Sequence, residues 1–225
     1  MFTLGPALVA GAPTDPSFAS VTLLLKGDGA NGATTFTDSS SFVRSISRNG
    51  TTTITTAQSK FGGSSINFPG SASNLDCGSG ISFTGAFTIE FWLRYTDETT
   101  IGQVLLSSSS ASPYFYLSKG TNGTNSRIEA RVNATSLTSA PYDLSVNTWY
   151  FVQFTRTAGG ALSLYVGGAL KDSSSNATSI PSGRQIYVGY DALIGNALVG
   201  QIDDLRITDG IVRSSAVPTE AFPSA

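Results

Sequence analysis

The clearest pattern of hydrophobic and polar positions in this chain is a strict alternation over residues 87–95. One set of alternate positions is apolar and the other mixes hydroxyl, carboxylate, indole and guanidinium groups: Phe87, Ile89, Phe91, Leu93 and Tyr95 against Thr88, Glu90, Trp92 and Arg94. A period of two, rich in aromatic and β-branched residues, predicts a long strand inside a sheet. The apolar face needs a second layer to cover it, whereas the mixed face is polar enough to meet water or a ligand.

Shorter alternating or apolar runs recur along the chain, separated by glycine turns such as Gly159-Gly160 and Gly167-Gly168. No window shows a helical period. Many strands at short, regular spacing predict an all-β fold, a two-sheet antiparallel jelly-roll sandwich, and a length of 225 residues fits one such domain. Besides residues 87–95, the main expected strands are 21–26, 104–107, 114–117, 127–132, 149–156, 162–166, 185–190 and 200–207.

Composition removes several classes of function. Charged residues make up only 12% of the chain and the net charge is -2, so there is no basic patch for nucleic acid. Histidine, the commonest general base and transition-metal ligand, is absent, and the single Cys77 excludes an intrachain disulfide. No apolar run reaches the ~18 residues that suggest a membrane span. The surface is therefore expected to be neutral and polar, as on proteins that pack in assemblies or bind glycans.

Both ends of the chain are predicted to lie outside the strands. Residues 1–20 hold three prolines among small residues, which disfavours helix and central strand. The apolar start lacks the basic region of a signal peptide, so an extended N-terminal arm is expected. It is either a frayed terminus or a segment docked on another subunit or virion protein. A jelly-roll domain over residues 21–213 and a proline-containing tail over 214–225, packed on that domain, complete the organisation.

Four segments are informative through their order and spacing: SKFGGSSINF at 59–68, FTIEFW at 87–92, WYFV at 149–152 with LSLYVGG at 162–168, and GQIDDLRIT at 200–208. Together they resemble the laminin G-like, concanavalin A-like jelly-roll superfamily, over roughly residues 21–213. The stretch DLRITDGIVR at 204–213 is similar to versions found in phage virion proteins and marine bacterial genomes. The resemblance implies two antiparallel sheets packed face to face, one of them concave.

The superfamily includes glucanases, whose catalytic strand carries two glutamates bracketing an aspartate, all facing the cleft. A retaining pair needs its carboxyl groups ~5–5.5 Å apart. The four glutamates of this chain are Glu90, Glu98, Glu129 and Glu220, and none has a carboxylate two residues away on its strand. Without histidine there is also no Ser–His or Cys–His pair. The chain is therefore expected not to be an enzyme.

Laminin G-like domains often hold a calcium ion, so the resemblance makes calcium the one cofactor to consider. Asp28 lies in a Gly-Asp-Gly turn, and Asp203 shares its strand parity with the apolar Leu205, where an unpaired carboxylate is costly. Asp28 and Asp203 are the candidate calcium ligands. Alternatively, Asp203 caps a turn or pairs with an arginine such as Arg206 or Arg44, and no cofactor is required.

Aromatic residues suggest carbohydrate binding, because sugars stack their C–H faces on rings while amides and carboxylates bond the hydroxyl groups. Trp92, flanked by Glu90 and Arg94 on one strand face, has that chemistry, and Tyr187 supplies a further ring. These four are the candidate carbohydrate-binding residues. Further candidates are Tyr114, Tyr116 and Tyr190. The alternative for Trp92 is a structural role in the core.

Three functions fit the sequence. The first is a non-enzymatic phage virion protein, a tail, fibre or capsid-surface component made in the host cytoplasm, which assembles through its arm and attaches to host-surface glycans. The second is a bacterial glycan-binding module, secreted or on the cell surface. The third, a glycan hydrolase, lacks the carboxylates that it needs. None involves nucleic acid or membrane insertion.

Overall fold

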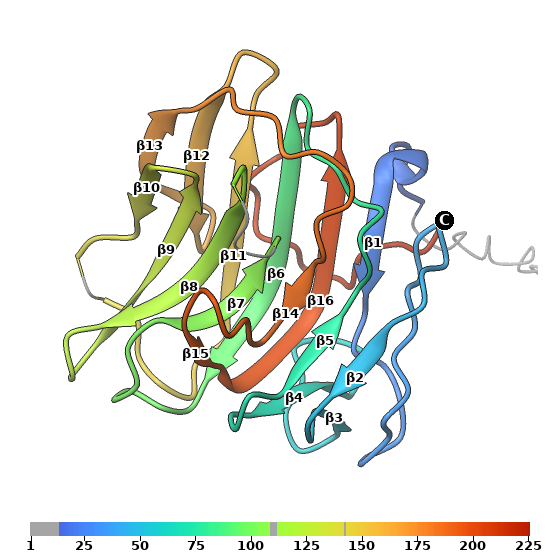
Figure 1. Cartoon of the computed structure of the whole chain (residues 1–225). Helices are drawn as coiled ribbons and strands as arrows, with labels where there is room; N and C mark the ends of the chain where they lie inside the picture. Colours follow the sequence, from blue (N-terminus) through green and yellow to red (C-terminus); the bar gives the residue numbers. More distant parts are fainter. Residues whose placement is uncertain (1–13, 109–111, 142) are drawn as a thin grey trace, which may run out of the picture.

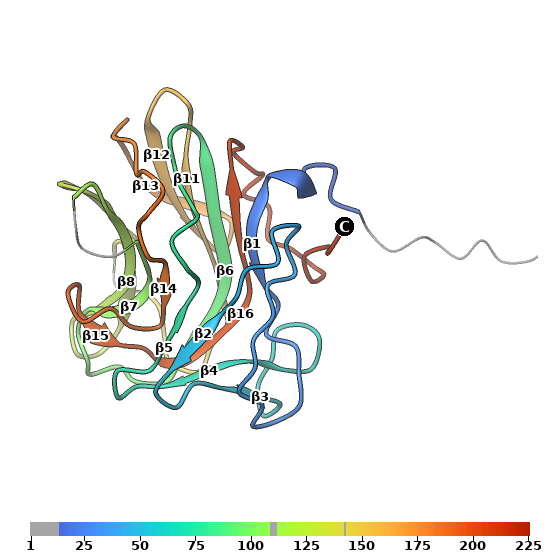
Figure 2. The same cartoon turned by 45° about the vertical axis from the view of Figure 1, so that its right-hand side comes forward.

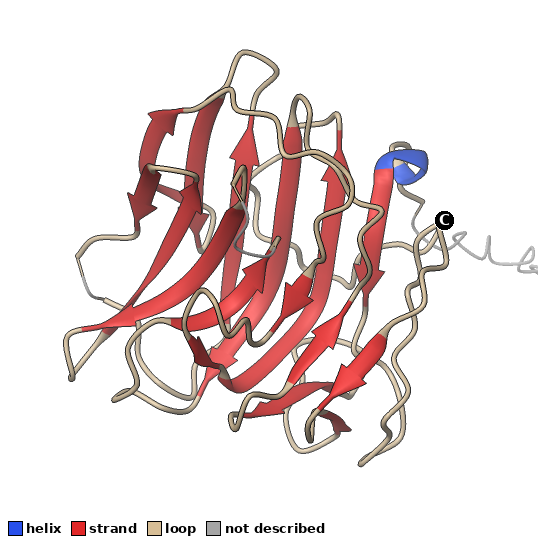
Figure 3. Cartoon of the chain, in the orientation of Figure 1, coloured by secondary structure: helices blue, strands red, loops and turns tan. Residues whose placement is uncertain are grey.

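Two eight-stranded sheets pack face to face in the structure, a computed structural model that describes residues 14–108, 112–141 and 143–225 (Figure 1). The prediction of an all-β, two-sheet antiparallel sandwich is confirmed. Figure 3 shows strands throughout, and the helix in the described residues is a single 3-10 turn at Phe18–Ser20. No helix in these ranges is long and apolar enough to span a membrane.

One sheet, called the β6 sheet, is built around the strand predicted at residues 87–95. Its strands in spatial order are β13 (Ala169–Ser175), β12 (Ala161–Val166), β11 (Tyr150–Arg156), β6 (Phe87–Tyr95), β16 (Val199–Asp209), β4 (Ser65–Pro69) and β3 (Thr53–Thr55), with β1 (Val21–Leu25) also paired to β16. The observed β6 has the predicted bounds.

The other sheet, called the β8 sheet, is more irregular at one end. Its strands in order are β10 (Thr135–Thr138), β9 (Ser126–Val132), β8 (Phe115–Thr121), β7 (Gln103–Ser107), β14 (Tyr187–Val188), β5 (Asn74–Asp76) and β2 (Ser47–Asn49), with β15 (Asn196–Ala197) paired parallel to β7. At one side of the sandwich, Asp172 of β13 accepts a hydrogen bond from the Thr138 backbone N–H of β10 at 2.9 Å, which joins the two sheet edges.

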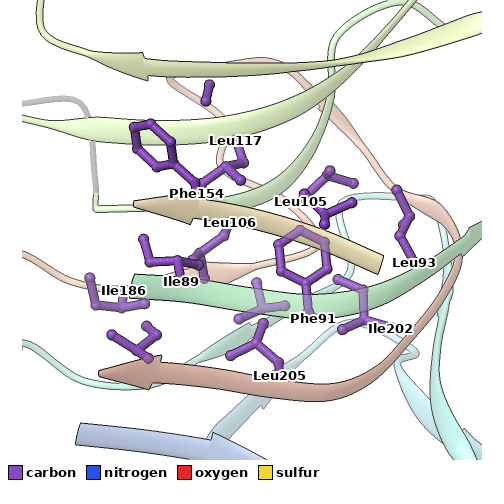
Figure 4. Packing of buried hydrophobic residues seen from close by; sticks show 14 of the residues in the cluster. Ile89, Phe91, Leu93, Leu105, Leu106, Leu117, Phe154, Ile186, Ile202 and Leu205 are labelled. Carbon is purple, nitrogen blue, oxygen red and sulfur yellow. The ribbon is translucent and has the colours of Figure 1, made fainter. Parts of the chain in front are cut away.

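The core fills the space between the sheets (Figure 4). The five apolar residues of β6, alternate along the strand as predicted, are all fully buried: Phe87, Ile89, Phe91, Leu93 and Tyr95. Leu106 of β7 and Leu117 of β8 belong to the same buried cluster, so they face this strand from the opposite sheet. Since alternate residues of a strand point to opposite faces, the remaining residues of β6, β8 and β14 form the outer faces on which a site must be sought.

The N-terminal segment differs from the expected extended arm in its last residues. Asp15 is buried, and its backbone N–H donates to the carbonyl of Ala225 at 2.8 Å. Phe18 packs against a second hydrophobic cluster on the outer side of the β6 sheet. Residues 14–20 are thus held on the domain by packing and by charge, while the remainder of the predicted arm, residues 1–13, lies outside the described residues.

Candidate functional site

The outer face of β6, expected to meet water or sugar, is covered by other parts of the chain. Trp92 is only 4% exposed, because the rings of Phe61 and Phe151 lie 5.9 and 5.5 Å from it, and Phe222 belongs to the same cluster. Lys60 Nζ lies 4.0 Å from the indole centroid. An indole enclosed in this way offers no free face to a sugar. The expectation of an open face is corrected: Trp92 packs structurally, the alternative that the sequence left open.

Beside Trp92, Glu90 belongs to a buried network of charges. Arg206 Nε donates to Glu90 Oε1 at 2.8 Å, and Arg206 Nη1 lies 3.1 Å from Asp15 Oδ2. Arg213 reaches the same Asp15 oxygen at 2.7 Å, and Gln153 Nε2 donates to Glu90 Oε2 at 3.1 Å. Glu90 is only 2% exposed, so its carboxylate pairs with Arg206, which in turn holds Asp15, and it does not reach a surface where sugar would bind.

The four predicted carbohydrate-binding residues are not brought together. Arg94 is half-buried at the rim, where it donates hydrogen bonds to Gln201 Oε1 and Asn147 Oδ1, both at 2.8 Å. Tyr187 lies on β14 in the other sheet. Of the four, only Tyr187 stands on the outer face of the β8 sheet, where it is half-buried.

A β-bulge changes the expected direction of Asp203. Asp203 pairs with Trp92 across β6, and the register then shifts before Arg206, with Asp204 at a φ of 52°. Leu205 still points into the core. The expectation that Asp203 shares the parity of Leu205 is therefore wrong, because a bulge inserts one extra residue. It lets two adjacent carboxylates avoid the core, and aspartate is among the residues that tolerate positive φ.

Both carboxylates at the bulge hold distant loops. Asp203 Oδ2 accepts the backbone N–H groups of Lys60 and Phe61 at 2.6 and 3.1 Å, and Asp204 Oδ2 accepts that of Phe222 at 2.6 Å. The Oδ1 atom of each finds no hydrogen-bond donor among the described residues. Burial raises the pKa of Asp203 to about 7 and that of Asp204 to about 6. Capping of backbone N–H groups, one of the two alternatives for Asp203, is what the geometry shows.

Asp28, the other predicted calcium ligand, lies close enough for its charge to contribute to the raised pKa of both Asp203 and Asp204. It packs against Gly62, where an added Cβ would stand 2.1 Å from Asp28 Oδ1. The unpartnered oxygens have the chemistry that calcium prefers, but the ion takes six to eight oxygens. The described residues contain no group of three or more acidic, Cys or His side chains placed to hold a metal, so a calcium ion here would need backbone carbonyls and water besides these carboxylates.

The outer face of the β8 sheet presents a different arrangement. Strand register places one residue from each of five neighbouring strands in a line, in the order Asp76, Tyr187, Ser107, Tyr116 and Arg131. Their chain neighbours lie in the core and show that the line faces outward: Leu75, Val188, Leu106, Leu117, Ala130 and Val132. We call these five residues, together with Tyr114 beside Tyr116, the tyrosine row. All but Ser107 are half-buried, so part of each of these side chains remains exposed.

One end of the row is aromatic and basic. The rings of Tyr114 and Tyr116 are parallel, with 6.3 Å between centroids and 4° between planes. A hydrogen bond with the Tyr116 side chain raises the pKa of Arg131, whose Nε also donates to the backbone carbonyl of Asn133. Asn133 Oδ1 in turn accepts the Tyr114 backbone N–H at 3.0 Å. These bonds fix the two rings and the guanidinium relative to one another.

The other end is acidic. Burial raises the pKa of Tyr187, and the nearby charges of Asp76 and Asp191 raise it further. Gln185 Nε2 donates to both oxygens of Asp76 at 2.6 Å, and Ser107 Oγ donates to Asp191 Oδ2 at 2.8 Å. The row therefore combines rings, carboxylates, an amide and a guanidinium on one face, the chemistry that recognises a sugar.

Sequence reasoning named Tyr187 and mentioned Tyr114 and Tyr116, but it missed Asp76 and Arg131. Alternation in residues 126–132 does put Arg131 on the polar face of its strand. Strand pairing was the missing information, because the five residues come from five separate strands.

Comparison with known proteins supports the fold. The family described as the concanavalin A-like lectin/glucanases superfamily, Laminin_G_3, matches residues 62–217. No curated protein sequence matches the chain significantly.

Among solved structures, one similar fold is domain 4 of AbnA, a GH43 extracellular arabinanase from Geobacillus stearothermophilus, in complex with arabinotriose, with a TM-score of 0.64 and 19% identity over 88% of this chain and 96% of that one. Another is the receptor binding domain of botulinum neurotoxin D, with a TM-score of 0.65 and 17% identity over 88% of this chain and 51% of that one. A third is the botulinum neurotoxin serotype D ligand binding domain in complex with N-acetylneuraminic acid. Its TM-score is 0.63, with 17% identity over 88% of this chain and 49% of that one. The chain thus spans about half the length of the toxin domains, and at these identities the likeness is one of fold.

Proposed function

The chain belongs to the concanavalin A-like lectin/glucanases superfamily, and from this premise we propose that it is a non-enzymatic, lectin-like protein that binds glycans. We propose further that it is a virion component, in a tail, in a fibre or on the capsid surface, and that it attaches the particle to host-surface glycans. The alternative is a bacterial glycan-binding module, secreted or on the cell surface.

The observation that carries the glycan-binding proposal is the tyrosine row. Tyr116 and Tyr187 offer half-exposed rings on one sheet face, with hydrogen-bonding groups at both ends. Similar folds include an arabinanase domain in complex with arabinotriose and a toxin domain in complex with N-acetylneuraminic acid. Such an open face contacts few sugar rings, so each site is expected to be weak. Many copies on one particle would then multiply the modest affinity.

The non-enzymatic part of the proposal rests on where the unusual carboxyl groups lie. A glycosidase needs a proton-donating carboxyl group with a raised pKa beside the bound sugar. Burial raises the pKa of Asp203, Asp204 and Asp209, but all three belong to β16, in the opposite sheet from the tyrosine row. Asp76, in the row, is engaged by the amide of Gln185.

A glycan array tests the binding proposal. We expect the wild-type protein to bind a defined set of glycans and the Tyr116→Ala, Tyr187→Ala double variant to lose that binding with its thermal unfolding nearly unchanged. Tyr165→Ala is the matched control, because Tyr165 is also half-buried but lies on β12 in the β6 sheet. Full binding by the double variant would remove the tyrosine row as the site.

The virion proposal is supported by the resemblance of residues 204–213 to phage virion proteins and by a nearly uncharged composition suited to assembly. We propose that residues 1–13 dock on a neighbouring subunit or another virion protein. Light scattering after size exclusion should show assembly of the whole chain and its loss when the chain starts at Thr14, which keeps the buried Asp15. A monomeric whole chain that binds glycans would favour the bacterial module.

A further inference from the structure

We infer that the tyrosine row takes an acidic oligosaccharide, one that carries a sugar carboxylate, and that this carboxylate lies at the Arg131 end of the row. The inference rests on the proposed glycan binding and adds the class and orientation of the ligand. It follows from an asymmetry of charge along a single line of residues.

Arg131 carries a positive charge that no carboxylate of the described residues pairs with. Among the described residues it forms no ion pair, and its hydrogen-bond partners, the Tyr116 side chain and the Asn133 carbonyl, are uncharged. The neighbouring Arg127, on the same face of β9, instead pairs with Glu129 at 2.7 Å. A guanidinium without an anion is suited to bind a carboxylate through two parallel hydrogen bonds.

A second guanidinium lies beside the segment that leads into Tyr114. Arg184 is half-buried and donates through Nη2 to the backbone carbonyl of Ser112 at 2.8 Å, two residues before Tyr114. It too forms no ion pair in the described part of the chain. Arg131 gives its end of the row a positive charge beside the two parallel tyrosine rings, and Arg184 adds a second cation next to the segment before Tyr114.

The opposite end would repel an anion. Asp76 and Asp191 both act on Tyr187 through their negative charge. A sugar placed there must offer hydroxyl groups as donors, which carboxylates accept well, and not a second carboxylate. The row thus predicts direction: neutral hydroxyl groups at Tyr187, the rings of Tyr114 and Tyr116 beneath the sugar, and the acid at Arg131.

Calorimetry with a matched pair of probes tests the inference. 3′-Sialyllactose and its methyl ester share one skeleton, and they differ only in the charge of the single carboxylate at one end. We expect the acid to bind about tenfold or more tightly than the ester, because hydrogen bonds to charged groups are the stronger ones. We also expect its affinity to fall between about 50 mM and about 500 mM salt, while that of the ester does not, because salt screens exposed charges.

Arg131→Gln should reduce the preference for the acid to about twofold or less, since the substitution removes the charged donor. The double variant Arg127→Gln, Glu129→Gln removes another guanidinium of the same strand together with its ion-pair partner, and it should retain the preference. Tyr116→Phe, which removes only a hydroxyl group, should weaken the binding of the acidic probe and leave the fold intact. Equal binding of acid and ester by the wild-type protein, or an unchanged preference in Arg131→Gln, would overturn the inference.

The glycan array separates this inference from the function on which it rests. Binding of neutral glycans alone would overturn the acidic ligand and leave the proposed lectin function in place. Binding of no glycan at all, with both probes inactive, would overturn the function and the inference together. Binding of 3′-sialyllactose but not of lactose on the array would support the inference independently of the ester pair.

Discussion

The outer faces of the two sheets both carry aromatic rings, carboxylates and guanidinium groups. On the β6 sheet, Trp92, Glu90 and Arg206 lie under the C-terminal tail and the segment around Phe18, and their charges are paired. On the β8 sheet, Tyr116 and Arg131 lie half-exposed, and Arg131 is without an ion pair in the described residues. Composition of a strand face does not distinguish a site from a contact between segments. The difference lies in which groups the rest of the chain has already satisfied.

The largest expected effect comes from Trp92→Ala. Because Trp92 is buried between Phe61 and Phe151, its removal should destabilise the fold by about 3–5 kcal/mol, measured by urea unfolding. Binding of glycan by the fraction that remains folded should be unchanged. If the variant instead keeps its stability and loses glycan binding, the roles of the two faces are reversed.

A second effect, of comparable size, should appear as pH is varied. The folded-state pKa values of Asp203, about 7, and Asp204, about 6, lie above the ordinary 3.8, so the folded protein holds protons more firmly than the unfolded chain. The contribution of these two groups to the stability of the fold is then greatest below pH 4 and is lost as pH rises through about 7. Each unit of difference between the folded and unfolded pKa corresponds to about 1.4 kcal/mol.

Thermal unfolding from pH 4 to pH 8 measures this dependence. Asp203→Asn keeps an oxygen for the Lys60 and Phe61 N–H groups and should flatten it. Asp143→Asn, at an exposed ion pair with Lys171, is the control and should not. A wild-type stability that rises steadily with pH would contradict the argument.

We propose a third, calcium-dependent effect at the same place, since Asp203 Oδ1 and Asp204 Oδ1 lack donors among the described residues. Calcium at about a hundred times its dissociation constant would stabilise by about 2.7 kcal/mol and would oppose the pH effect by neutralising the carboxylates. Melting curves in calcium and in excess chelator measure it, with Asp28→Asn as the variant expected to remove the difference. Identical curves would exclude a structural calcium ion at Asp28 and Asp203.

The smallest effect on stability is expected on the β8 sheet. Arg131→Gln and Tyr116→Phe should change the free energy of unfolding by no more than about 0.5 kcal/mol, because their outer atoms meet solvent. Comparison with Trp92→Ala by the same urea titration measures the contrast between the faces. A large loss of stability in either variant would make the tyrosine row a structural feature like the covered face.

The sequence was enough for the fold and for much less of the site. Alternation predicted β6 with its observed bounds, because the apolar residues of a strand with one buried face show which side chains point into the core. Burial of Trp92 depends on Phe222, far away in the chain, and no local pattern specifies that contact. The bulge also made the prediction for Asp203 wrong. Alternation placed Asp203 on the same face as Leu205, but one inserted residue reverses the faces of the residues that follow. Sites assembled from five strands, such as the tyrosine row, require strand pairing to be known.

The hydrogen bond between Asp15 and Ala225 also has a practical consequence for display. Both ends of the described chain leave the molecule at one place, and Figure 2 shows the C-terminus on the side away from β7 and β8. A tag or carrier fused directly at Thr14 or at Ala225 would therefore orient the module in the same way, with the tyrosine row turned outward. A short peptide joining these two residues would close the chain into a circle, and the ends of a circular permutant could then be reopened in an exposed loop such as the one around Gly123.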